Sequence, residues 1–478
     1  MMEIRLQKLW AVKTFQNHQI PTKQNHNPPI NPYFRAKLII NHMSKLKLLF
    51  ILVFGAAGAQ AQKVAFTEYE LKNGLHVVLH QDNSAPVVAV SVMYHVGSKN
   101  EKTDRTGFAH FFEHLLFEGS DNIKRGEFMK IVSSNGGQNN ANTTQDRTFY
   151  YEVFPSNQLE TGMWLESERM MHPVINEIGV KTQNEVVKEE KRMRVDNQPY
   201  GNFLTEVMKR LFTKHPYNWV PIGSMDHLDA ATLQEFIAFN KKYYVPNNAV
   251  LVITGDINIE KTKKLVEAYF ADVPKGAPVE KVNVQEEPIT HEVVDTAYDA
   301  NIQIPAIMSA YRTPGMTSKE SAALELASSV LSNGASSRMY KKMVDDKKNA
   351  LQVGCFNYAL EDYGAYISYA LPNNGTALDT LLKDMDDEIV KLQNNLISEN
   401  EFTKIRNQYE NDYVGKNAKV LGVAENLADG YTFHNKNTNH INEELDEIRK
   451  VTREDIQLVA KKYLNRNQRV VVYYLPKK

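Results

Sequence analysis

A largely apolar segment carries two histidines and constrains the fold more than any other stretch of the chain. It runs from Gly107 to Ser120 and reads GFAHFFEHLLFEGS. As a helix, it places His110 and His114 one turn apart on one face, with Glu113 beside them. Two imidazoles at that spacing can hold one metal ion, and the carboxylate can take a proton from a water molecule held by the metal. The flanking phenylalanines and leucines predict that this helix is mostly buried.

The five-residue motif alone leaves two interpretations open. The plainer one is a pair of core histidines held by hydrogen bonds, because buried polar groups need partners. The other is a catalytic zinc site, because His-x-x-Glu-His is typical of the inverzincin zinc peptidases. The single cysteine, Cys355, excludes an intrachain disulfide and any site with several cysteines. A zinc site would therefore consist of histidines and carboxylates, and it would need a third protein ligand.

Five carboxylates on two predicted helices are candidates for that third ligand. They are Glu166 and Glu168 on one helix, and Glu185, Glu189 and Glu190 on the next. Spacing alone does not choose among them, since a charged helical run is commonly a solvated face. We expect three other histidines to be surface or structural residues rather than ligands: His172, His215 and His227.

Residues 43–61, MSKLKLLFILVFGAAGAQA, have the pattern of a secretory signal peptide. Two lysines precede an apolar run that is too short to span a membrane, and a small-x-small cleavage site follows. Signal peptides stand at the N-terminus, so we expect Met43 to be the native start and residues 1–42 to be a non-native or disordered extension. A disordered extension before a membrane anchor is the alternative. The mature chain would begin near Gln62 and reside in the periplasm.

The charge of the predicted mature chain argues against nucleic acid as a partner. The whole chain has 56 Lys and Arg and 57 Asp and Glu residues. Residues 1–61 contain eight of the former and one of the latter, so the remainder has 48 basic and 56 acidic side chains, a net charge of −8. An acidic chain without a basic run does not fit a phosphate backbone.

Strand and helix patterns alternate in two similar halves. Residues 62–272 form the first, residues 273–290 are a predicted linker rich in proline and charge, and residues 291–478 form the second. We predict an α+β fold of two homologous domains, each an antiparallel-rich sheet with helices mostly on one face, enclosing a chamber. A shift of 215 residues places His110, Glu113 and His114 opposite Glu325, Ser328 and Ser329. Metal ligands would then belong to the first half only.

The chain resembles the pitrilysin family, which includes insulin-degrading enzyme and the mitochondrial processing peptidases. The resemblance extends from Phe66 to Leu475. It is strongest in GFAHFFEHLLFEGS, NNANTTQDRTFYY, VVKEEKRMRVDNQPYG, HPYNWVPIGSMDHL and YYVPNNAVLVITGDI. It implies that Glu190 is the third ligand of a Zn²⁺ ion. Members often carry a supporting glutamate seven residues earlier, where this chain has Gln183, so we expect altered metal affinity or pH dependence rather than loss of the site.

The same resemblance implies a zinc-dependent endopeptidase that hydrolyses peptide bonds in unfolded peptides or proteins, with Glu113 as general base. Residues Asn140, Ala141 and Asn142 resemble the edge strand that pairs with an extended substrate. An ordinary strand in a polar hairpin is the alternative. A non-catalytic subunit of such a peptidase and an unrelated zinc hydrolase or metal-binding protein are the competing functions.

One departure from the family pattern concerns substrate positioning. Active single-chain members carry an Arg and a Tyr in the C-terminal half that hold the substrate. The matching positions here are Val344 and Leu351. We therefore expect a heterodimer with a related subunit that carries the Arg and Tyr, with a homodimer as the second possibility.

Overall fold

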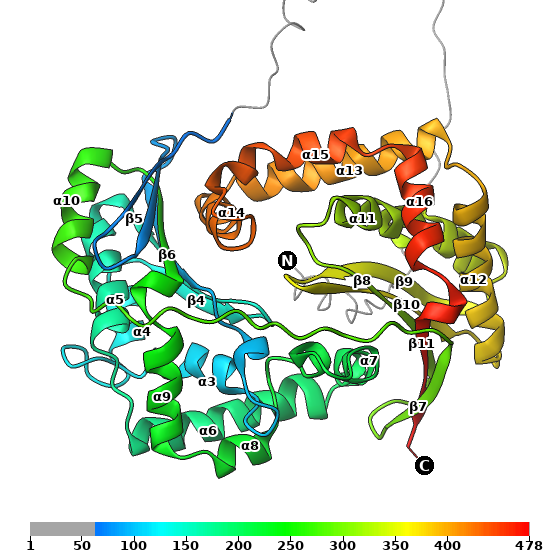
Figure 1. The fold of residues 1–478 in the computed structure, drawn as a ribbon, viewed down its shortest axis with the longest axis horizontal. Coiled ribbons are helices and arrows are strands. Elements are labelled where there is room, and N and C mark those ends of the chain that lie inside the picture. Colours follow the sequence, from blue (N-terminus) through cyan, green and yellow to red (C-terminus); the bar gives the residue numbers. More distant parts are fainter. Residues whose placement is uncertain (1–62, 478) are drawn as a thin grey trace, which may run out of the picture. The chain divides into compact units, whose positions relative to one another are not determined.

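The computed structural model describes residues 63–477, which contain two β-sheets (Figure 1). The predictions for residues 1–42 and for the signal peptide at 43–61 lie outside the described residues. The first sheet has the strand order β1-β2-β6-β3-β5-β4. Its strands are β1 (Thr67–Glu70), β2 (His76–Gln81), β3 (Val87–Tyr94), β4 (Gln138–Thr143), β5 (Thr148–Pro155) and β6 (Ala249–Gly255). Only β2 and β6 run parallel, and the other neighbours are antiparallel.

The helices of the first half, with the exception of α7, share one core with this sheet. They are α3 (Phe108–Leu115), α4 (Phe128–Ser134), α5 (Leu159–Met171), α6 (Glu177–Lys191), α7 (Phe203–Leu211), α8 (Met225–Ala230), α9 (Leu233–Tyr243) and α10 (Ile259–Phe270). Val90 and Val92 of β3 share this core with Phe111 of α3, Val187 of α6 and Phe236 of α9. The buried central strands β3 and β6 explain why their sequences are almost continuously apolar.

The second sheet repeats this topology. Its order, β7-β11-β8-β10-β9, matches β2-β6-β3-β5-β4, and β7 runs parallel to β11 just as β2 does to β6. Its strands are β7 (Val293–Asp299), β8 (Ala306–Pro314), β9 (Ala350–Ala359), β10 (Tyr363–Pro372) and β11 (Arg469–Pro476). Its helices are α11 (Lys319–Ser332), α12 (Leu378–Asn394), α13 (Glu399–Asn417), α14 (Val420–Phe433), α15 (Glu444–Lys450) and α16 (Arg453–Tyr463). The predicted α+β class with two similar domains is therefore confirmed.

Each half contributes a helix to the sheet of the other half. Leu427 and Phe433 of α14 share a core with Val78 and Val252 on the face of the first sheet away from its own helices. In return, α7 contacts β8 and β11, and Phe203 at its start meets the ring of Tyr369 in β10 edge-on at 5.5 Å. Because of this exchange, neither sheet buries both of its faces with helices from its own half.

The chain between the two halves crosses without regular structure but is held at one point. Residues 274–290 contain no helix or strand. Within them, a carboxylate oxygen of Glu286 accepts backbone N–H groups of Thr213, Lys214 and His215, and the same carboxylate pairs with Arg312. The exact domain boundaries and the enclosed chamber stay predictions.

Candidate metal centre

The apolar side chains of helix α3 are packed in the core of the first half, and this packing leaves its polar residues on another face of the helix. Phe108 stacks on Phe236 with ring centroids 4.6 Å apart, and Phe112 stacks on Phe239 at 5.7 Å. These side chains recur at the three- and four-residue spacing of a buried helix face. The helix begins after Gly107, whose φ of 98° lies in the left-handed region that suits glycine.

The motif residues converge on one point. One ligand atom from each of His110, Glu113 and His114 lies within 4.8 Å of the others, and the two imidazole rings are 4.8 Å apart and nearly perpendicular. Within residues 63–477, this is the one group of three or more His, Cys, Asp or Glu side chains placed to share a metal ion. His110 is buried, and His114 is partly exposed.

Helix α6 packs against α3 and brings Glu190 to this point. Its Oε2 lies 2.9 Å from His114 Nε2 and 3.5 Å from His110 Nε2. The neighbouring Glu189 is turned away, with a side chain 54% exposed and paired with Arg192. Of the five carboxylates left open by spacing, Glu190 is the one that contacts both histidines.

The other three candidate carboxylates have partners elsewhere. Glu166 is buried against Arg169, Glu168 accepts hydrogen bonds from Ser120 and Asn122, and Glu185 is largely exposed beside Lys188. The three further histidines also lie apart from the centre. They are His172, near Glu168; His215, buried next to Asp362; and His227, bonded to Thr106.

The residues present fit a zinc ion. Nδ1 of His110 is buried and makes no hydrogen bond, and Oε2 of Glu190 is buried and faces the Nε2 atoms of both histidines. Burial and the neighbouring His114 lower the pKa of His110 to about 4. Burial raises the pKa of Glu190, but His114, His110 and Arg194 outweigh it and lower that pKa to about 2. A neutral imidazole beside an ionised carboxylate is the protonation state in which these groups bind zinc.

Gln183 lies on α6 but is connected to the end of α3 rather than to the histidines. Its Nε2 donates a hydrogen bond to Oε1 of Glu118 at 2.5 Å. The same Glu118 carboxylate also accepts a hydrogen bond from Arg125. Gln183 and Glu118 therefore link α6 to the segment four residues beyond His114.

Strand β4 contains Asn140, Ala141 and Asn142 and forms the edge of the first sheet. It pairs with β5, and no other strand of residues 63–477 pairs with its outer edge. β4 also contacts α3, so this open edge runs beside the helix of the motif (Figure 1).

Two residues of the centre were not among the candidates from sequence. Arg194 Nη1 lies 2.8 Å from Oε1 of Glu190, and its spacing of four residues on a helical run could have indicated the pair. Glu101 accepts the backbone N–H groups of Gly107 and Ala109 at the start of α3. No short spacing rule identifies Glu101 as a cap, because it lies six residues before Gly107, the residue that precedes the helix.

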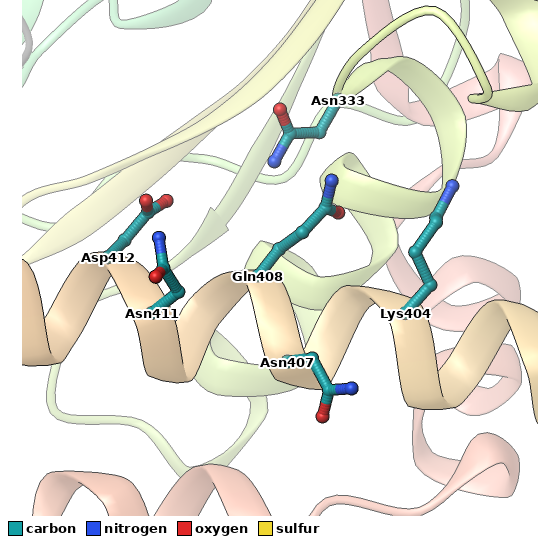
Figure 2. Close-up of a pocket in the computed structure, with 6 residues that line it drawn as sticks. All are labelled: Asn333, Lys404, Asn407, Gln408, Asn411 and Asp412. Atoms are coloured by element: carbon teal, nitrogen blue, oxygen red, sulfur yellow. The ribbon is translucent and has the colours of Figure 1, made fainter.

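The second half has a polar pocket at the corresponding place. Helix α11 follows β8 as α3 follows β3, and α13 follows α12 as α6 follows α5. Between the end of α11 and α13 lies a pocket of about 500 Å³, lined by Asn333, Lys404, Asn407, Gln408, Asn411 and Asp412. Figure 2 shows Lys404 and Gln408 rising from α13 on the side of Asn333. This lining contains no histidine, so it does not repeat the ligand set of the first half.

The two positions that were expected to carry an Arg and a Tyr both lie in the second half. Val344 stands in the helical turn Tyr340–Asp346, and Leu351 stands near the start of β9 with 51% of its surface exposed.

Among residues 63–477, no helix combines the length and apolar character needed to cross a bilayer.

Comparisons with known proteins agree with this architecture. Residues 76–218 match the model of the insulinase family, peptidase family M16, and residues 230–409 match the model of the peptidase M16 inactive domain. The zinc protease PqqE of Helicobacter pylori is 30% identical over 396 residues, which cover 82% of this chain and 89% of that protein.

Solved structures give the same result. A protease from Helicobacter pylori superposes with a TM-score of 0.83 at 29% identity, covering 87% of this chain and all of that one. The first half of the periplasmic protease PqqL from Escherichia coli superposes with a TM-score of 0.71 at 18% identity, covering 87% and 93%. Against the whole PqqL chain, the match covers 48% of its length. This chain therefore belongs to the insulinase family of peptidases, peptidase family M16.

Proposed function

We propose that this chain is a zinc-dependent endopeptidase that hydrolyses peptide bonds in unfolded peptides or proteins. The observation that supports this most is the convergence of His110, His114 and Glu190, with Glu113 on the same helix, beside the open edge of β4. A hydrogen-bonded pair of core histidines accounts less well for the arrangement, because Nδ1 of His110 is buried and makes no hydrogen bond. Relatives named zinc proteases support the same function.

In this proposal, different residues bind the zinc ion, transfer the proton and align the substrate. His110, His114 and Glu190 would hold the zinc ion, which supplies the Lewis acidity that polarises the scissile carbonyl and lowers the pKa of water. Glu113 would accept the proton of the attacking water and deliver it to the leaving amine. The backbone of β4 at Asn140–Asn142 would align the substrate as an added strand, so that affinity comes mainly from main-chain hydrogen bonds.

Gln183 would support this centre indirectly. Because its amide is bonded to Glu118, it ties α6 to the segment that follows His114. A neutral amide at this position leaves the net charge near the ligands less negative than a glutamate would. We therefore expect Gln183→Glu to change zinc affinity or the pH profile without abolishing the site.

A non-catalytic subunit is the second candidate function. It is favoured by the inactive-domain model that matches residues 230–409. It is disfavoured by the presence of His110, Glu113 and His114 together with Glu190, since a chain released from catalysis has no need of Glu113.

We further propose that the active form is a heterodimer. Val344 and Leu351 stand where active single-chain relatives are expected to carry the Arg and Tyr, and the fold matches only about half of the PqqL chain. A related subunit would supply the missing pair and complete the substrate site. Export to the periplasm is supported by the pattern of residues 43–61 and by the periplasmic naming of PqqL.

Cleavage of unfolded peptides by the purified chain, alone and with its related subunit, tests the proposed function. Activity that disappears with a chelator and returns with Zn²⁺ would support an endopeptidase. A chain that binds zinc but stays inactive under every pairing would favour the non-catalytic subunit. The Glu113→Gln variant is the control for contaminating peptidases, because it keeps the ligands and removes the base.

A further inference from the structure

One short turn ahead of the metal-binding helix touches both halves of the chain. The 3₁₀ turn Ser98–Asn100 follows β3, and Glu101 ends it. Lys99 and Glu101 are both buried, with 5% and 7% of their surfaces exposed. Buried ionisable groups need specific partners, and the two residues have different ones.

Glu101 caps helix α3. Its Oε2 accepts the N–H of Gly107 at 2.9 Å, and its Oε1 accepts the N–H of Ala109 at 2.8 Å. Trp219 Nε1 donates to Oε2 as well, at 3.1 Å. Gly107 has no side chain to cap the helix, so the carboxyl oxygens of Glu101 satisfy amides that would otherwise lack partners. One of these amides belongs to the residue directly before His110.

Lys99 reaches three carboxylates from two different parts of the chain. Its Nζ lies 3.0 Å from Asp146, 2.5 Å from Glu361 and 3.2 Å from Asp362. Asp146 follows strand β4 in the turn to β5, whereas Glu361 and Asp362 form the turn between β9 and β10 of the second sheet. The ammonium group therefore joins the first half to the second at a buried point.

Backbone contacts hold the same three segments together. The N–H of Lys99 donates to the carbonyl of Gln145 at 2.9 Å, and the N–H of Glu361 donates to Oδ2 of Asp146 at 3.0 Å. A Cβ at Gly97 would come within 2.5 Å of backbone atoms in residues 144–146. The turn is thus pressed against the end of β4, and only glycine fits at that contact.

Further side chains of the first half reach the second-half turn. His95 Nε2 lies 2.7 Å from Glu361, and His215 Nε2 lies 3.3 Å from Asp362. The N–H of Asp362 donates to the hydroxyl of Tyr217 at 3.1 Å. Loss of the Glu361 and Asp362 charges would leave Lys99 buried with one carboxylate instead of three, and the turn that carries Glu101 would lose its anchor.

We propose that the Glu361–Asp362 turn of the second half positions the metal-binding helix and the adjacent strand β4 through Lys99 and Glu101. This turn thereby contributes to the centre without touching metal or substrate. Its catalytic consequence rests on the proposed peptidase function, whereas its effect on the start of α3 does not.

The test uses the full mature chain with Glu361→Gln, Asp362→Asn and the double variant. Asp384→Asn is the matched control, because Asp384 is a buried carboxylate of the second half paired with Lys347, in a different cluster. Amide hydrogen exchange at Gly107 and Ala109 is measured on metal-free protein, and Zn²⁺ affinity is measured by competition with an indicator. We expect the double variant to exchange at least about tenfold faster at these amides and to bind Zn²⁺ on the order of tenfold more weakly.

Kinetics and coupling add two further readouts. With active enzyme, kcat should fall about tenfold, and KM should rise as well, because strand β4, which would align the substrate, is held through the same turn. The effects of Glu101→Gln and Glu361→Gln on Zn²⁺ affinity should be non-additive, since both act through one turn. Lys99→Arg, which keeps the charge, should retain more affinity than Lys99→Met.

The outcomes separate this inference from the proposed function. Exchange at Gly107 and Ala109 that is no faster in the double variant than in Asp384→Asn would overturn the inference, even if the chain is an active zinc peptidase. Faster exchange in a chain that cleaves no peptide would uphold the structural link and reject the peptidase. If the double variant does not fold, the same comparison is made with Asp362→Asn alone.

Discussion

Oε2 of Glu190 lies 2.9 Å from Nε2 of His114, although the two residues are on different helices and far apart in the chain. Helices α3 and α6 are in contact, and Leu115 of α3 and Val187 of α6 are both buried in the core of the first half. That apolar packing holds the carboxylate against the two imidazoles, and the histidines keep Glu190 ionised. The three side chains proposed as metal ligands are therefore held together by contacts within the protein itself.

Substitutions at the centre should separate metal binding from chemistry. Glu113→Gln should keep zinc and reduce kcat by about 10²- to 10⁴-fold, because it removes the general base. His110→Ala, His114→Ala and Glu190→Ala should lose zinc. Zinc content by elemental analysis, beside peptide cleavage rates, checks both statements.

Glu189→Ala is the matched control for the ligand assignment. Glu189 is adjacent in sequence, but its side chain is exposed and paired with Arg192. It should bind zinc as the unsubstituted chain does. Normal zinc content in Glu190→Ala together with loss in Glu189→Ala would reverse the assignment.

The start of α13 should give the second half a defined acid sensitivity. Arg338 donates two hydrogen bonds to Glu401, which also caps the helix through Ser398. Arg338 is the main cause that lowers the pKa of Glu401 to about 2, below the value near 4.3 of an unfolded chain. Stability from this carboxylate is thus present above about pH 4.3 and is lost as the pH falls toward about 2.

Glu401→Gln should therefore reduce the free energy of unfolding at neutral pH, because it removes the charge that pairs with Arg338. The reduction should be only about 1 kcal/mol, because the Glu401 side chain is partly exposed and solvent weakens the pair. It should also flatten the dependence of stability on pH between about 4.3 and 2. Urea unfolding at several pH values measures both effects. Glu410→Gln, which breaks a surface pair with Arg449, should leave the acid limb unchanged.

The exchange of helices between the halves should prevent the first half from folding alone. A chain that ends at residue 272 lacks α14, so Val78, Met93, Val250 and Val252 would lie on an open sheet face. Exposed apolar surface of that kind leads to association or a loosely packed state. Strong binding of an apolar dye and weak near-ultraviolet circular dichroism are expected for residues 62–272.

Co-expression with residues 273–478 supplies the complement to that experiment. The two pieces should form a soluble pair with the circular dichroism of the intact chain. A monomeric, cooperatively unfolding first half without its partner piece would contradict the prediction.

Activity should depend on a related subunit. Misplacement of a reacting group by about an ångström can cost roughly a hundredfold in rate, and this chain has Val344 and Leu351 at the positions expected to hold substrate. Adding a related subunit that carries the Arg and Tyr should raise kcat/KM by at least about tenfold. High activity of the isolated chain, unchanged by that subunit, would show that the pair is not required.

Local sequence determined the parts of this protein that depend on short-range periodicity. The spacing of His110, Glu113 and His114 specifies one helix face, and flanking phenylalanines specify that the helix is buried. The repeated order of strand and helix patterns predicted two similar α+β halves. In both cases, residues close in the chain carry the whole signal, so no distant contact is needed to read it.

Only tertiary structure decided which carboxylate meets the histidines. Glu189 and Glu190 differ by one helical step of about 100°, and the packing of α6 on α3 determines which of them faces inward. The exchange of α7 and α14, and the contacts of Lys99 and Glu101, have the same origin. The helix exchange and the ion pairs of Lys99 join residues more than a hundred positions apart, and Glu101 caps α3 from outside the helix. Such contacts exist only once both sheets have formed and packed.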